Sequence, residues 1–198
     1  DGRSRVLAGF ADMGASEALT IRNITSDMWY GTLQSAVNDS AEGDEIEAYP
    51  GIYDPVDFDG RGIKLRSIDP SDWSVVENTA IKTASGNGVN FMSDESEASI
   101  LSGFTVVSSG GNAISIVDSS PVIKNCVLAE SINGFAALGQ ASPVIERCKV
   151  YQNSYSGITT HAIDTTVSNN WVYDNGNWGI YCNSQAVIKK VDSTHKCN

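Results

Sequence analysis

Apolar residues recur at a fixed interval through the second half of the chain. Four consecutive segments, 98–119, 120–141, 142–164 and 165–186, align under one another, and their apolar columns repeat about every 22 residues. The columns are Leu101, Ile123, Ile145 and Val167; Val106, Leu128, Val150 and Val172; Phe104, Cys126, Cys148 and Asn170; and Ile114, Phe135, Ile158 and Ile180. Such a period predicts stacked copies of one small unit.

Each unit holds two or three short strand patterns separated by Gly or Asn, and it cannot bury its apolar face alone. Stacking the units places equivalent residues ~4.8 Å apart and turns every column into a ladder inside a cylinder. We therefore predict an all-β fold, a parallel β-helix with regular coils over residues 98–186. Right-handed winding is favoured because parallel crossover connections are overwhelmingly right-handed. An immunoglobulin-like sandwich or a jelly roll would not repeat side chains in register, because antiparallel hairpins reverse their order.

The pattern is looser upstream. Residues 32–42 place Leu33, Ala36 and Val37 on one helical face, with Thr32 as N-cap and Gly43 beyond the end. We expect this short helix to cover the open end of the first coil. Strands are expected within residues 43–51, 56–60, 62–67, 79–83 and 88–93.

Several stretches carry a family resemblance. They are LQSAVNDSAEGDEIEAYPGIYDPVDFDGRGIKLRS, ILSGFTVV, the repeated SPVIxxC, and GIYC. Over about residues 30–186 the chain resembles secreted right-handed parallel β-helix repeat proteins, a group that includes pectate-lyase-like and NosD-like chains. The resemblance implies a module of a larger secreted or surface protein. Residues 1–24 then read as the tail of a preceding module or a linker, since GFADMGASE looks like a closing segment, and residues 25–198 read as the β-helix domain.

The net charge of the chain limits the classes of partner that we expect it to bind. The net charge is −11 and no stretch gathers Lys or Arg, so we expect no nucleic acid partner. No apolar run approaches the ~18 residues of a membrane span. The acidity would also repel an acidic polysaccharide unless a cation bridged the two.

Motifs of glycan-cleaving relatives do not match. Polygalacturonase-type hydrolases share an NTD, DD, GHG and RIK series, but Asn78-Thr79 is followed by Ala80 and the chain has no DD pair. Pectate-lyase-type sites need stacked Asp residues, whereas the outward column here is mixed, with Lys124, Glu146 and Ser168. His161 should point outward, as a proton carrier or a plain turn residue. An enzyme, either a polysaccharide lyase or a glycoside hydrolase, is kept as the alternative to a non-catalytic role.

Acidic and sulfur-containing residues suggest further sites. Asp94, Glu95 and Glu97 form either a calcium-binding loop or a solvated one. Cys126 and Cys148 share a column, and nearly parallel side chains favour two buried thiols over a disulfide. Alternation from Ile180 predicts that Cys182 points inward, and Cys197 is either free or paired at the C-terminal end.

Aromatic residues give the most distinctive surface prediction. Tyr151 and Tyr173 follow inward-facing Val150 and Val172, so they should project outward and stack one coil apart. Trp178 and Tyr181 lie in the same late coils. Exposed rings at coil spacing stack on sugars, or they pack against a neighbouring module. The sequence thus predicts a rigid extracellular scaffold or adhesive module whose partners are polysaccharide or neighbouring β-helix modules.

Overall fold

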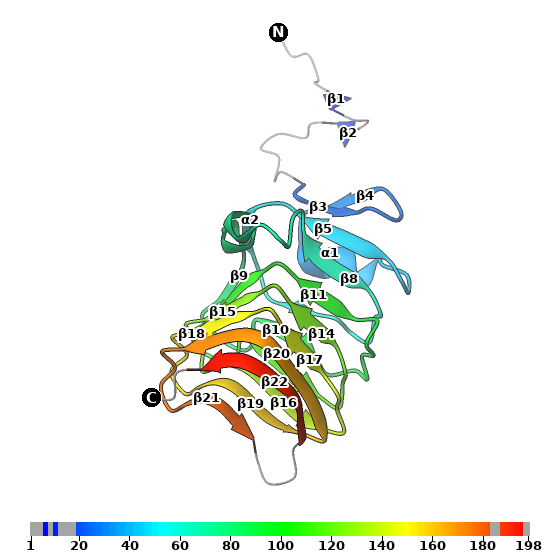
Figure 1. Cartoon of the computed structure of the whole chain (residues 1–198). Coiled ribbons are helices and arrows are strands. Elements are labelled where there is room, and N and C mark those ends of the chain that lie inside the picture. The colour runs from blue at the N-terminus through cyan, green and yellow to red at the C-terminus, as the bar shows by residue number, and fades with distance from the viewer. Residues whose placement is uncertain (1–5, 8–9, 12–18, 183–186, 196–198) are drawn as a thin grey trace.

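The computed structural model describes residues 6–7, 10–11, 19–182 and 187–195. Its coils stack in chain order, and two sheets, whose strands are mainly parallel, run along the stack (Figure 1). Among the residues that the structure describes, the small sheet has six strands. They are β7 (Val56–Asp57), β10 (Val89–Phe91), β13 (Ile114–Val117), β16 (Asn133–Gly139), β19 (Ser156–Ala162) and β21 (Trp178–Cys182). The predicted all-β parallel solenoid is confirmed.

The large sheet has two arms that meet at β20 (Asp164–Tyr173), and β22 (Val187–His195) also pairs with β20. The first arm contains β5 (Glu45–Ala48), β8 (Lys64–Ser67), β11 (Ile100–Ser102), β14 (Val122–Lys124) and β17 (Val144–Glu146). The second arm contains β6 (Gly51–Tyr53), β9 (Thr79–Thr83), β12 (Thr105–Ser108), β15 (Val127–Ala129) and β18 (Lys149–Tyr151). A separate antiparallel pair, β1 (Val6–Leu7) and β2 (Phe10–Ala11), precedes both sheets.

The predicted columns form the core. Ile123 pairs with Leu101 and Ile145, Ile145 pairs with Val167, and all four side chains are fully buried. Val106, Leu128, Val150 and Val172 form the equivalent ladder on the second arm. Ile114, Phe135, Ile158 and Ile180 do so on the small sheet, where Ile180 is half-buried. Like side chains in register therefore fill the cylinder, as the 22-residue period requires.

The N-terminal end is covered by α1 (Leu33–Asn38) and an antiparallel pair, β3 (Ile21–Asn23) and β4 (Met28–Tyr30). Thr32 caps the helix as predicted, although the helix is shorter than the expected 32–42. Gln34 donates from Nε2 to the carbonyl of Asp57 and accepts from its amide, at 3.1 and 2.8 Å. This side-chain amide takes the place of a neighbouring strand beside β7.

Strand β3 lies inside residues 1–24, the predicted tail, yet it pairs with β5 of the large sheet. Most of the closing-like segment GFADMGASE lies outside the described residues. The role of residues 1–24 as a tail or linker stays a prediction.

A second helix, α2 (Trp73–Asn78), lies between β8 and β9 in the chain and was not predicted. Asp72 caps it by accepting from the amide of Ser74. Val76 packs on the outer face of the large sheet against Val127 and Ala129, and these three residues form a second small buried cluster. Neither helix in the described part of the chain is long and apolar enough to cross a membrane.

Residues with a left-handed backbone conformation lie at equivalent corners of successive coils. Asn125, Arg147 and Asn169 have φ between 52° and 56°, and Gly103 occupies the same corner with φ 78°. A second corner repeats this at Glu130, Gln152 and Asp174, with φ between 51° and 55°. Such φ values cost a non-glycine residue roughly 1 kcal/mol. Buried amides that follow the turns, such as Asn153 donating to the carbonyls of Leu128 and Tyr151, offset that cost.

The predictions for the four cysteines have different outcomes. Cys126 and Cys148 are buried free thiols, as predicted. Burial raises the pKa of the Cys148 thiol. Cys182 is also free; it was predicted to point inward, and its side chain is exposed. It pairs in register with buried Thr160, yet β21 is the outermost strand of the small sheet in the described part of the chain, so no further coil there covers it. Cys197 lies outside the described residues.

Candidate aromatic binding surface

Four aromatic residues on the outer side of the second arm form what we call the aromatic face. They are Trp73, Tyr151, Trp171 and Tyr173. Tyr151 pairs in register with Tyr173, next to the inward pair Val150 and Val172. The tyrosine ring centroids lie 5.0 Å apart with an interplanar angle of 12°. The predicted outward stack is therefore confirmed, and both rings are half-buried.

Helix α2 adds a tryptophan to this stack from far away in the sequence. Trp73 meets Trp171 edge to face, with centroids 6.1 Å apart and planes at 72°. Trp171 remains 47% exposed, so indole surface stays open to solvent. Thr105 anchors α2 by donating its hydroxyl to the carbonyl of Val76 at 3.0 Å. The helix thus adds the ring of Trp73 to the three rings that strands β18 and β20 supply.

One lysine lies within the aromatic face. Lys149 Nζ is 4.1 Å from the centroid of the Trp73 ring, which is a cation–π contact. The same nitrogen lies 3.3 Å from Glu77 Oε1. Lys149 is the register partner of Trp171, so alternation places it on the same outer side. Its charge is therefore already matched by a ring and a carboxylate.

Carboxylates surround the tyrosines. Burial raises the pKa of Tyr151, and the nearby Tyr173, Glu77 and Glu130 raise it further. Burial also raises the pKa of Tyr173, with further contributions from Asp174 and Glu77. Both phenols therefore stay protonated near neutral pH and can donate hydrogen bonds to a ligand.

The other two predicted ring residues lie on the small sheet instead. Trp178 and Tyr181 have centroids 6.0 Å apart and are 54% and 37% exposed. His161 is exposed, as predicted, and its ring centroid lies 5.7 Å from that of Tyr181. These three residues form a separate aromatic group on another sheet.

The three acidic residues of the predicted calcium loop differ in their surroundings. Glu95 is buried, and its carboxylate accepts from the amides of Gly60 and Ser93 and the hydroxyl of Ser119 at 2.7–2.9 Å. Asp94 and Glu97 are exposed. Across the described ranges, no group of three or more His, Cys, Asp and Glu side chains is placed to hold a metal ion. The structure thus gives Glu95 the role of joining coils, and the calcium prediction gains no support from it.

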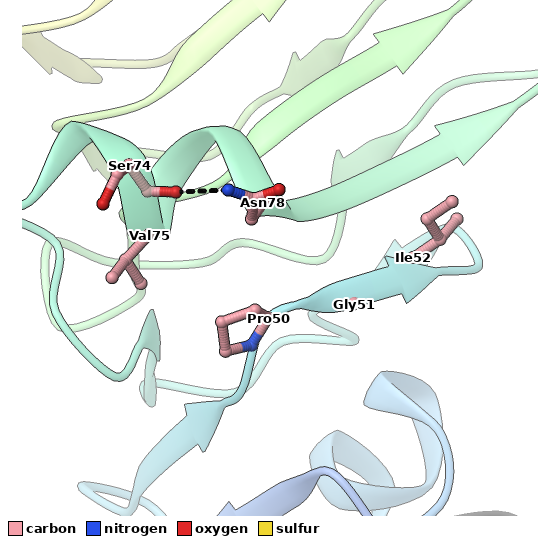
Figure 2. A pocket seen from close by; sticks show the side chains of 6 residues that line it. All are labelled: Pro50, Gly51, Ile52, Ser74, Val75 and Asn78. Atoms are coloured by element: carbon pink, nitrogen blue, oxygen red, sulfur yellow. Dashed lines mark hydrogen bonds between the residues drawn. The ribbon is translucent and has the colours of Figure 1, made fainter.

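An open hollow lies between β6 and α2 (Figure 2). Asn78 donates to the carbonyl of Ser74 at 2.8 Å within the helix, so that amide is already engaged. None of the six lining residues is charged, and Ile52 is 76% exposed. The lining residues are Pro50, Gly51, Ile52, Ser74, Val75 and Asn78. The lining is mainly apolar, with the hydroxyl of Ser74 and the amide of Asn78 as its polar side-chain groups, and it includes no acidic or basic residue.

Sequence reasoning missed part of the aromatic face. Trp171 could have been found, because it lies two residues before Tyr173 and alternation points it outward. Trp73 gave no such signal, since it falls outside the repeat. Its only local signs are the N-cap Asp72 and the helical spacing of Trp73 and Val76.

The sequence model of a protein family described as right handed beta helix region matches residues 57–197. No curated protein and no solved structure matches the chain. The matched range covers more than two thirds of the chain and contains most coils described above.

Proposed function

Because the chain belongs to the right-handed β-helix family, we propose that it is a rigid extracellular scaffold module whose aromatic face contacts polysaccharide. The stacked pair Tyr151 and Tyr173 carries this proposal. The extracellular location follows from the resemblance to secreted chains and is part of the proposal.

The chemistry of the aromatic face supports sugar contact. The two tyrosine rings face one another, so they offer ring edges and hydroxyl groups one coil apart. Trp171 offers exposed indole surface beside them. Aromatic carbon packs on the C–H surfaces of a sugar, while phenol hydroxyls bond its oxygen atoms. Both kinds of group stand on paired strands, which hold them rigidly.

Rigidity supports the scaffold part of the proposal. Parallel ladders join each coil to the next, and one continuous apolar core runs from Ile21 to Val172. A stacked core of this kind resists bending and keeps surface groups at fixed spacing. A long polymer can therefore engage several groups at once, so that weak single contacts add up.

The test is retention of the whole chain on insoluble glycans. Tyr151→Ala combined with Tyr173→Ala should weaken binding roughly tenfold or more, at ~1 kcal/mol per ring. Tyr49→Ala is the matched control, since it removes a partly exposed tyrosine near the opposite end. Circular dichroism should show the same fold in every variant. Unchanged retention of the double variant would refute the proposal.

A further inference from the structure

Acidic side chains border the aromatic face along a coil corner. Ala129, Tyr151 and Tyr173 are register partners, and each is followed by a left-handed corner residue. Those corner residues are Glu130, Gln152 and Asp174, and all three are exposed. The edge of the tyrosine stack is therefore lined by a carboxylate, an amide and a second carboxylate at successive coils.

Helix α2 supplies a third carboxylate from the other side. Glu77 is 59% exposed and lies 3.3 Å from Lys149 Nζ. The formal local charge is −2, because the single lysine is outnumbered by three carboxylates, those of Glu77, Glu130 and Asp174. Lys149 is also in contact with the Trp73 ring, so it is poorly placed to bind an anion. The whole chain carries −11, so the local and the overall charge have the same sign.

The same carboxylates raise the pKa values of the two tyrosines. Glu77 and Glu130 act on Tyr151, and Asp174 and Glu77 act on Tyr173. Carboxylates beside the rings attract cations through direct charge. The same arrangement repels carboxylate-bearing sugars.

We propose that the aromatic face selects a polysaccharide whose sugars carry protonated amino groups, a glucosamine polymer, over neutral and acidic polysaccharides. This inference rests on the proposed function and names its substrate class. The sugar rings contact Trp171 and the tyrosines. The ammonium groups lie toward Glu130 and Asp174 at the corner.

The experiment compares two insoluble polymers that differ only in the amine, a deacetylated glucosamine polymer and its fully acetylated form. Binding is measured at mildly acidic pH, where the polymer amine is protonated and exposed carboxylates stay largely ionised. The chain should bind the amine form about tenfold more tightly. Glu130→Gln combined with Asp174→Asn should reduce that preference about fivefold or more, since exposed charge pairs contribute modestly.

A matched control separates site charge from net charge. Asp94→Asn combined with Glu97→Gln removes the same two charges from the exposed loop between β10 and β11 and should leave the preference intact. An equal loss in this control would overturn the inference. A competition experiment gives a second way to overturn the inference. If a lysine oligomer eluted the chain as efficiently as a glucosamine oligomer of equal charge, the site would bind cationic peptides equally well.

The outcomes also separate the two proposals. Equal, tyrosine-dependent binding to both polymers would overturn the amino-sugar inference and leave the proposed function standing. Binding to neither polymer through the tyrosines, and to no other glycan, would refute both. Tighter binding to an acidic polysaccharide would overturn the inference alone.

Discussion

Replacing Ile145 tests whether the solenoid interior follows the columns. Its side chain is fully buried between register partners Ile123 and Val167. Ile145→Ala removes about three methylene equivalents at ~0.8 kcal/mol each, and a cavity adds to that loss. We expect a decrease of about 3–4 kcal/mol in the free energy of unfolding. Ile145→Asp should prevent folding, because it buries an unpaired charge.

The neighbouring residue provides the control. Val144 faces outward and is half-buried, so Val144→Ala should cost no more than about 1 kcal/mol. Urea unfolding is followed by circular dichroism and by tryptophan fluorescence, because stacked repeats do not always unfold in one step. Similar losses for the two alanine variants, or a loss below about 1 kcal/mol at Ile145, would refute the assignment of inward and outward columns.

Four further predictions follow from other parts of the chain. Gly157→Ala should lower the urea midpoint by the equivalent of about 2 kcal/mol, because a Cβ there would lie 2.7 Å from the carbonyl oxygen of Gly179; an unchanged midpoint would contradict the tight coil packing. Glu95→Ala should cost about 1–3 kcal/mol in the same assay, because the buried hydroxyl of Ser119 and the partly buried amides of Gly60 and Ser93 lose their acceptor. In a Cys197→Ser background a thiol reagent should label Cys182 quickly and the two buried thiols only in denaturant; fast labelling of three thiols would contradict their burial. Assays of reducing ends and unsaturated products should detect no efficient cleavage of a glycan panel, and turnover abolished by one acid substitution would favour the enzyme alternative.

The regular coils could be predicted because their length is constant. Leu101, Ile123, Ile145 and Val167 lie 22 residues apart, so period alone placed them in one ladder. The tyrosine stack followed from the same period and from alternation. Constant spacing thus fixes both the core and the outward residues that are next to it in the chain.

The other features of the core and of the aromatic face could not be predicted, because they depend on coils of irregular length or on contacts between distant coils. Leu65 belongs to the same ladder as Leu101 but precedes it by 36 residues, because α2 and its flanking loops are inserted between β8 and β9. No period connects Trp73 with Trp171, so their contact had no sequence signature. Glu95 was assigned to a surface loop because its donors come from three different coils. Cys182 was placed inside because alternation gives the direction of a side chain and not whether another coil covers it.

The position of α2 affects how cooperatively the stack of coils folds and unfolds. In a simple solenoid each coil contacts only its immediate neighbours, so end coils can detach one at a time. Here α2 precedes β9 in the chain, yet Trp73 contacts Trp171 on β20 and Glu77 contacts Lys149 on β18. Detaching the coil of β20 must therefore break contacts with a segment several coils away. The helix therefore couples the coil of β9 and the coil of β20 into one cooperative unit. This coupling suppresses local unfolding at the aromatic face, where the rings must stay in place.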